Sequence, residues 1–208
     1  MKGSLIVVVF FITGCLFGGF TNSWGLMLEG NAGRYVLYLL MFQVGLSIGS
    51  DQNLLKILKD LRPKHLLVPF ATIAGTLSFS ALAALFISRW SLFDCLAIGS
   101  GFAYYSLSSI LITDLKTASS GVQLATELGA IALIANLFRE IMALLGAPLF
   151  AKYFGNLAPI CAGGATTMDT TLPIITQYCG KDLIFIAILH GVLVDLSVPF
   201  LVSFFCSL

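Results

Sequence analysis

The chain has 208 residues, of which 58% are hydrophobic and only 10% are charged, and its formal net charge is +1. A soluble domain carries about 25% charged residues, so this composition excludes a soluble enzyme, a disordered tail and a coiled coil. The small net charge provides no basic surface for nucleic acid. The composition predicts an all-α polytopic membrane protein whose first partner is the lipid bilayer.

Seven hydrophobic segments follow one another along the chain. They cover about residues 4–20, 34–50, 66–88, 92–113, 127–150, 157–178 and 182–206. A helix needs about 20 apolar residues to span a bilayer, and the first two segments are close to the lower limit of that length. None of the segments shows the alternating pattern of a strand, so each is predicted to be a membrane helix.

Basic residues between the second and third segments determine the predicted orientation. Four of them lie within nine positions, at Lys56, Lys59, Arg62 and Lys64. Loops rich in lysine and arginine stay on the cytoplasmic side, so this loop is predicted to be cytoplasmic. Seven crossings would then place Lys116 and Lys181 inside, Lys152 outside, and the C-terminal Leu208 outside.

Charged residues in the middle of a hydrophobic segment are the strongest functional signal here, because inserting one costs at least about 2.5–3.5 kcal/mol. The fifth segment holds Arg139 and Glu140 near its centre. Neighbouring side chains on a helix point about 100° apart, so these two face different sides. Asn136, four residues before Glu140, shares its face. Glu140 and Asn136 are predicted to line a cavity, with a structural ion pair to another helix as the alternative.

The sixth segment is expected to be a discontinuous helix. Between Cys161 and Pro173 it contains two glycines, four threonines and Asp169. This composition is typical of a broken helix, whose free backbone groups line a binding site near the middle of the membrane. Asp169, Thr166 and Thr167 are therefore candidate residues for binding substrate or protons. The alternative is a polar loop outside the membrane.

The fourth and last segments contribute further polar candidates. Tyr105 and Ser106 follow a run of small residues in the fourth segment, where they either line a polar path or serve helix packing. The last segment holds His190 and Asp195, which lie about 140° apart around the helix. Histidine exchanges a proton near neutral pH, so His190 is a candidate proton relay, with a structural role as an equal alternative.

No cofactor is expected from this sequence. The five cysteines are scattered and the two histidines are far apart, so clustered ligands for a metal ion or haem are missing. The sequence also lacks a G-x-x-x-x-G-K-[ST] loop for nucleotide phosphates. The chain is therefore predicted not to be an enzyme, and any transport is expected to draw on an ion gradient.

Several short motifs occur in order along the second half of the chain. They are Gly101-Phe102, Tyr105-Ser106-Leu107-Ser108, Asn136 with Arg139-Glu140, the run from Gly164 to Asp169, Thr171-Leu172-Pro173, His190-Gly191 and Val198-Pro199. Together they resemble the lysine exporter LysO family, strongly over about residues 95–206 and weakly before. The resemblance implies export of L-lysine and its toxic analogue thialysine across the bacterial inner membrane, with Glu140 as a functional residue.

The resemblance also implies a partner and an architecture. Single-chain members of the family have an additional N-terminal membrane portion, and other members are split into a short and a long protein. This chain resembles the long one. A small membrane subunit of the N-terminal type is therefore expected as a partner, and association of the chain with copies of itself is a second expected interaction. The two would form a ten-helix transporter of inverted repeats. In the transporter domain 1–208, about residues 1–65 would end the first repeat and 66–208 would form the second.

The sequence thus predicts a secondary transporter that exports lysine by exchange with protons. Acidic residues within the membrane suit both a cationic substrate and an exchanged proton. Two alternatives stay open. One is a transporter of another amino acid or of an organic anion, with Arg139 as the binding charge. The other is a membrane assembly subunit that transports nothing.

Overall fold

The computed structural model describes residues 63–208, together with Thr13, Leu16, Leu39 and Phe42, which are all helical. The chain divides into two compact units, residues 1–38 and 39–208, and all the helices named here belong to the second. The first two hydrophobic segments and the basic cluster that precedes residue 63 lie outside the part described, apart from these four residues. The predictions made for them stay predictions.

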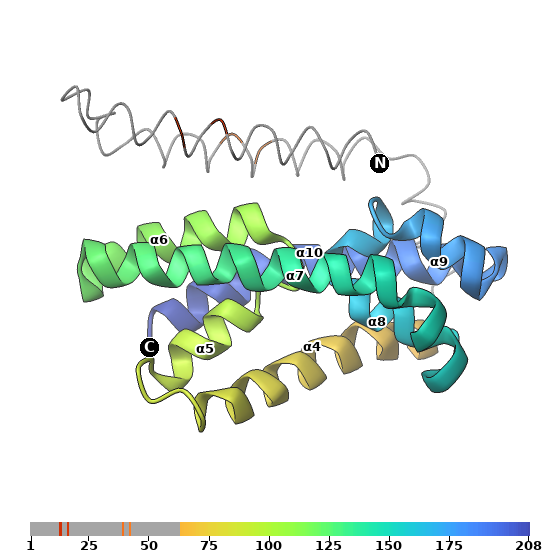
Figure 1. The fold of residues 1–208 in the computed structure, drawn as a ribbon, viewed down its shortest axis with the longest axis horizontal. Coiled ribbons are helices and arrows are strands. Elements are labelled where there is room, and N and C mark those ends of the chain that lie inside the picture. The colour runs from red at the N-terminus through yellow and green to blue at the C-terminus, as the bar shows by residue number, and fades with distance from the viewer. Residues whose placement is uncertain (1–12, 14–15, 17–38, 40–41, 43–62) are drawn as a thin grey trace. The chain divides into compact units, whose positions relative to one another are not determined.

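Helices make up nearly all of residues 63–208, and no strand occurs there (Figure 1). They are α4 (Pro63–Ala84), α5 (Leu92–Gly99), α6 (Tyr105–Ser120), α7 (Val122–Phe154), α8 (Ala158–Gly163), η1 (Gly164–Met168), α9 (Leu172–Cys179), η2 (Lys181–Leu183) and α10 (Ile184–Cys206). The predicted all-α fold is confirmed.

Three of these helices are long and apolar enough to cross a membrane. They are α4, α7 and α10, the last counted together with η2. Their outer faces carry large exposed hydrophobic side chains, such as Phe79 on α4, Leu145 on α7 and Phe200 on α10, each about three-quarters exposed. Such faces suit contact with lipid, as a multi-pass membrane protein requires.

The fourth hydrophobic segment is not one continuous helix, unlike the membrane helix that the sequence predicts. Helix α5 runs into the bundle, the chain turns at residues 100–104, and α6 returns to the same end (Figure 1). An ion pair of 2.8 Å between Lys116 Nζ on α6 and Asp94 Oδ1 on α5 ties the two arms together near that end. We call residues 92–120 hairpin 1.

The sixth segment is discontinuous, as predicted, but it also returns to the end from which it starts. Helix α8, the 3-10 turn η1 and α9 form a second re-entrant hairpin, residues 158–179, called hairpin 2. Ile160 on α8 and Ile175 on α9 pack together in one buried cluster with Ala187 near the start of α10. The sequence predicted one discontinuous segment, but both hairpins interrupt a hydrophobic segment, so the described part of the chain has two.

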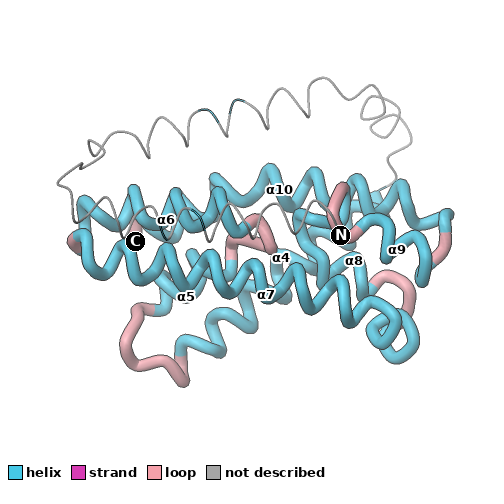
Figure 2. The backbone as a smooth tube through the Cα atoms, turned by 45° about the horizontal axis from the view of Figure 1, so that its top comes forward, coloured by secondary structure: helices cyan, strands magenta, loops and turns pink. Residues whose placement is uncertain are grey.

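The two hairpins enter from opposite ends and meet in the middle of the bundle, where Figure 2 shows the loop between the helices. The amide of Ala165 in hairpin 2 donates a hydrogen bond of 2.9 Å to the carbonyl of Phe102 in hairpin 1. Gly164 has a φ of +60°, and a Cβ there would lie 2.2 Å from the Phe102 oxygen. Glycine is therefore required at this contact.

Each hairpin follows a long helix, and the two helix–hairpin units run in opposite directions. Helix α4 leads into hairpin 1 at one end of the bundle, and α7 leads into hairpin 2 at the other (Figure 1). This is an inverted arrangement within residues 63–179. The larger ten-helix repeat expected from the sequence stays a prediction.

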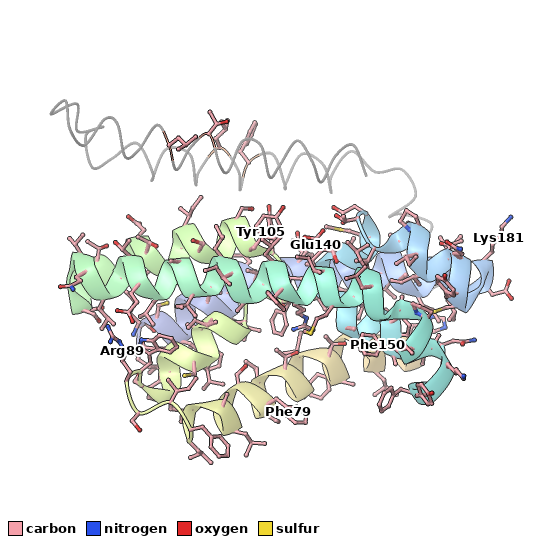
Figure 3. The ribbon with its side chains drawn as sticks, in the orientation of Figure 1. Phe79, Arg89, Tyr105, Glu140, Phe150 and Lys181 are labelled. Carbon is pink, nitrogen blue, oxygen red and sulfur yellow. The ribbon has the colours of Figure 1, made fainter. Side chains whose placement is uncertain are left out.

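The hairpins also revise the side on which the basic residues lie. Arg89 and Lys181 are at opposite ends of the bundle (Figure 3). Lys116, which pairs with Asp94, lies at the same end of the bundle as Arg89. Lys152, in the last turn of α7, lies at the same end as Lys181, where α4 begins. Lys152 therefore shares the side of the basic loop and Lys116 does not, which reverses both predictions.

This revised arrangement fits the preference for cytoplasmic positive charge as well as seven crossings do, because Lys116 and Lys152 only exchange sides. The two basic residues at the other end are both paired with acids. Arg89 Nη2 lies 2.6 Å from Glu127 Oε2, and Lys116 pairs with Asp94. The C-terminus still lies at the end opposite the start of α4. After the basic loop the sequence predicts five crossings and the structure has three long helices, and both numbers are odd.

Single cysteines at Ser120 and Asn156 distinguish the two topologies. Both residues are exposed, one before α7 and one after it. In a chain whose five native cysteines are replaced by serine, an impermeant thiol reagent added outside the cell should label Ser120→Cys and not Asn156→Cys. Seven crossings require the opposite result. A cysteine at Lys59, in the basic loop, serves as the cytoplasmic reference.

The ion pair in hairpin 1 is expected to affect stability most when only one of its two charges is removed. The Ser91 hydroxyl and amide donate to Asp94 Oδ2, at 2.7 and 3.0 Å, and Lys116 meets the other oxygen. Lys116→Met leaves a buried, uncompensated carboxylate and should lower the stability by about 3–5 kcal/mol. The double variant with Asp94→Asn should lose less.

Thermal unfolding in detergent, followed by size-exclusion chromatography, measures these differences. Arg89→Met is the control, because the Arg89 side chain is 70% exposed. An exposed pair of this kind contributes at most about 1 kcal/mol. Equal losses in the single and double variants of the buried pair would contradict the prediction.

Candidate functional site

The turn of hairpin 1 is held by Asn136, from the middle of α7. Its Oδ1 accepts a hydrogen bond of 2.8 Å from the Ala103 amide, and its Nδ2 donates to the Ile98 carbonyl at 3.2 Å. Phe102 and Ala103 are fully buried and have positive φ angles of 44° and 74°. Such angles are costly for residues other than glycine, so the turn depends on these bonds.

Arg139, one turn after Asn136, holds hairpin 2. Its Nε and Nη2 each donate a 3.0 Å hydrogen bond, to the carbonyls of Ala162 and Cys161, and its Nη1 donates to Thr76 Oγ1 on α4 at 3.1 Å. These carbonyls end the short helix α8, where the partial charge of the backbone is negative. The guanidinium also lies 5.7 Å from the centre of the Phe102 ring. Arg139 thus connects α4, α7 and both hairpins.

A second set of contacts involves Thr166 and Thr167 in η1 and His190 on α10. His190 is fully buried, with Nε2 2.8 Å from Thr72 Oγ1 and Nδ1 3.0 Å from Thr167 Oγ1. The Thr166 hydroxyl donates to the Gly163 carbonyl at 2.8 Å. These contacts satisfy the polar atoms of all three predicted residues and favour the structural alternative for His190.

Glu140 faces away from these contacts, toward the tips of both hairpins. Its side chain is 8% exposed and interacts with the Thr170 hydroxyl and the charge of Asp169, both just before α9. Tyr105, at the start of α6, interacts electrostatically with Glu140 and Asp169, and Figure 3 shows the two labelled side chains near the middle of the bundle. Among the predicted residues, Glu140, Asp169 and Tyr105 are therefore brought together.

Ser106 lies next to Tyr105 in the first turn of α6 and is partly exposed. Asp169 is exposed, and its Oδ1 accepts hydrogen bonds from the amide and the hydroxyl of Thr170, the latter at 3.1 Å. The carboxylate of Asp169 thus sits beside the beginning of α9.

Asp195 also belongs to this site, although the sequence favoured His190 on the same helix as the candidate. It lies in the middle of α10 and is only 3% exposed. It interacts electrostatically with Asp169 and with Tyr104, at the turn of hairpin 1. Glu140, Asp169 and Asp195, from three different elements, form what we call the carboxylate cluster. An acid at the centre of a hydrophobic segment was the signal that could have identified it.

Two helices begin beside this cluster. Helix α6 begins at Tyr105 and α9 at Leu172, and neither receives a hydrogen bond from a side chain of its N-cap residue. The first amides of a helix lack partners within it and carry a partial positive charge. At α9 the Leu172 amide donates to the Asp169 carbonyl and Pro173 has no N–H, so the start of α6 is the helix end that suits an anion.

Two grooves, of about 280 and 590 Å³, lie on the other side of α7. Both reach Arg139, and α4 lines both. Their walls are almost entirely apolar and include none of the carboxylate cluster, so they suit hydrocarbon better than a charged solute. Within the described residues, no three side chains of histidine, cysteine, aspartate or glutamate are arranged to hold a metal ion.

Comparison with known families finds one that matches most of the chain. The model of the family described as lysine exporter LysO matches residues 8–206, which include both hairpins and the carboxylate cluster. The chain belongs to the lysine exporter LysO family.

Two similar proteins support this assignment. The chain is 33% identical over 177 residues to the lysine exporter LysO of Escherichia coli strain K12, which covers 85% of this chain and 55% of that protein. It is 34% identical over 196 residues to a candidate lysine exporter of Haemophilus influenzae, over 94% of both chains. The chain thus spans about half of the first relative and nearly all of the second. No solved structure matches significantly.

The contact between the hairpin tips predicts a difference between two glycines. Gly164 and Gly155 both have positive φ angles, but a Cβ at Gly155 would meet nothing within 4 Å. Gly155→Ala should therefore lose about 1–3 kcal/mol, the cost of a backbone conformation that essentially only glycine adopts. Gly164→Ala has the same cost and also collides with the Phe102 carbonyl, so its melting temperature in detergent should be clearly lower. Equal melting temperatures would show that the tips do not touch.

Proposed function

We propose that the chain is a secondary transporter that exports L-lysine across the bacterial inner membrane. The observation that carries the proposal is the position of Glu140. It is buried in α7, where the tips of two opposed re-entrant hairpins meet. Binding sites of secondary transporters lie near the middle of the membrane, at broken helices of this kind. The names of both relatives refer to lysine export.

The charges around Glu140 suit an amino acid with a positively charged side chain. Lysine carries two ammonium groups and one carboxylate. The carboxylate cluster would bind the ammonium groups, and the beginning of α6 would bind the carboxylate. Thialysine carries the same charged groups, so we include it as a substrate.

Exchange with protons would supply the energy. Moving a lysine cation out of a cell against an inside-negative potential costs about 2.3 kcal/mol per 100 mV. Entry of one proton for each lysine removes this electrical cost, because no net charge then crosses the membrane. A buried carboxyl group can hold either a proton or an ammonium ion, which makes the two compete.

The alternative of an organic anion bound by Arg139 receives less support. Three nitrogens of its guanidinium already donate to Ala162, Cys161 and Thr76. An anion would have to displace protein carbonyls that end α8. A cationic substrate at Glu140 requires no such change.

Glu140→Gln tests the proposal. The substitution keeps the shape of the side chain and removes the charge that pairs with ammonium, so lysine export should be abolished while the protein stays in the membrane at normal abundance. Glu127→Gln is the matched control, since Glu127 lies on the same helix but pairs with Arg89 at its end. It should export at nearly the wild-type rate.

The assay is counterflow of labelled lysine into vesicles that contain the chain, alone and together with the small membrane subunit expected from the family resemblance. Wild-type counterflow that Glu140→Gln eliminates would support the proposal. Counterflow at the wild-type rate in Glu140→Gln would mean that Glu140 is structural and that lysine binds elsewhere.

A further inference from the structure

Asp195 is the least compensated charged group in the described part of the chain. It is 3% exposed and forms no hydrogen bond or ion pair with any described residue. Asp94, the other deeply buried aspartate, differs because it pairs with Lys116 and accepts two hydrogen bonds from Ser91. Glu140 differs less: it lies beside the Thr170 hydroxyl, whose hydrogen bond goes to Asp169. Among the described residues, Asp195 therefore has neither a cation nor a donor.

The ionisable groups around α10 do not change this conclusion. Those that face Asp195 are Asp169 from hairpin 2 and Tyr104 from hairpin 1. Others on neighbouring elements lie near the ends of α10 or toward its His190 face: His65 beside Phe185, Lys181 and Asp182 in η2, Asp94 and Lys116 near Cys206, and Arg139 near His190. The nearest charge is thus another acid, which repels an ionised Asp195.

A buried carboxylate without a cation or a donor is so costly that the group takes up a proton and becomes neutral. The structure points to a division of work within the proposed exporter: Asp195 holds the transported proton, and Glu140 binds the ammonium of the substrate. The inference rests on the proposed function, since it assigns roles within the same site. It gives Asp195 a role that the sequence motifs did not suggest.

The exchange balances in protons and charge. When lysine binds from the cytoplasm, its ammonium groups stabilise the ionised form of Asp195, and the carboxyl releases its proton to the cytoplasm. On the outer side, a proton binds to Asp195, removes that negative charge and weakens the hold on the ammonium groups, so lysine leaves. One proton enters for each lysine cation exported. Asp169, which interacts with both Glu140 and Asp195, lies between the two roles.

The first test reads the proton directly and needs no substrate. Infrared difference spectra of the purified chain at neutral pH should show the carbonyl stretch of a protonated carboxylic acid, and Asp195→Asn should remove it. Asp182→Asn is the matched control, because Asp182 is an exposed aspartate at the opposite end of α10 from Cys206. It should leave the band unchanged. A spectrum of Asp195→Asn identical to that of the wild type overturns the inference.

The second test separates coupling from substrate binding. Asp195→Asn should retain exchange of labelled for unlabelled lysine but lose export driven by a proton gradient. The fall in lysine affinity as the pH is lowered, about 5–150-fold for couplings of this kind, should disappear. Loss of exchange and net export together in a folded Asp195→Asn, or undiminished proton-driven export, overturns the inference.

Folding of each variant is checked by size-exclusion chromatography, and Asp195→Glu, which keeps the acid, replaces Asp195→Asn if that variant aggregates. The glutamate variant should keep proton-driven export and shift the infrared band, and an unshifted band overturns the inference. The two proposals can fail separately. If the wild-type chain shows the Asp195 band but no lysine counterflow even together with the small membrane subunit, lysine export is contradicted, and Asp195 would carry the proton in the transport of another cation.

Discussion

The hydrogen bond from the Ala165 amide to the Phe102 carbonyl joins the tips of two hairpins that interrupt the membrane helices. A bilayer offers no water to unpaired backbone groups, so a chain that breaks its helices there must satisfy every freed amide and carbonyl within the protein. The direct bond satisfies one pair. Others are satisfied within the hairpins, and several depend on α7, whose Asn136 binds the turn of hairpin 1 and whose Arg139 binds the carbonyls that end α8.

Helix α7 thereby separates two environments. Asn136 and Arg139 face the hairpins as structural ties, and the next residue, Glu140, faces the carboxylate cluster. A change of one position along a helix turns a side chain by about 100°, which is enough to point Arg139 and Glu140 to different sides of the helix. The cation that holds hairpin 2 is thus kept from neutralising the acid proposed to bind the substrate.

Much of the site, and part of the fold, could be predicted from the sequence. Charges in apolar segments led to Glu140 and Asp169, and the glycines and threonines of the sixth segment predicted its break. Hairpin 1 was missed because two short helical arms joined by a buried turn have the same apolar length as one membrane span. The small residues around Gly101 were consistent with packing as well as with a turn. Asp195 was ranked below His190 because the partners that satisfy the histidine, Thr72 and Thr167, come from distant parts of the chain.

The order in which the ribosome makes these elements has a consequence for the newly synthesised chain. Hairpin 1 emerges before α7, so Phe102 and Ala103 must wait for Asn136 before their left-handed backbone is supported. Hairpin 2 emerges after α7 and finds Arg139 already in the membrane. The nascent protein therefore passes through a stage in which one strained, unsupported turn is present in the bilayer. Chains that stop before α7 expose that turn to the quality-control proteases of the membrane.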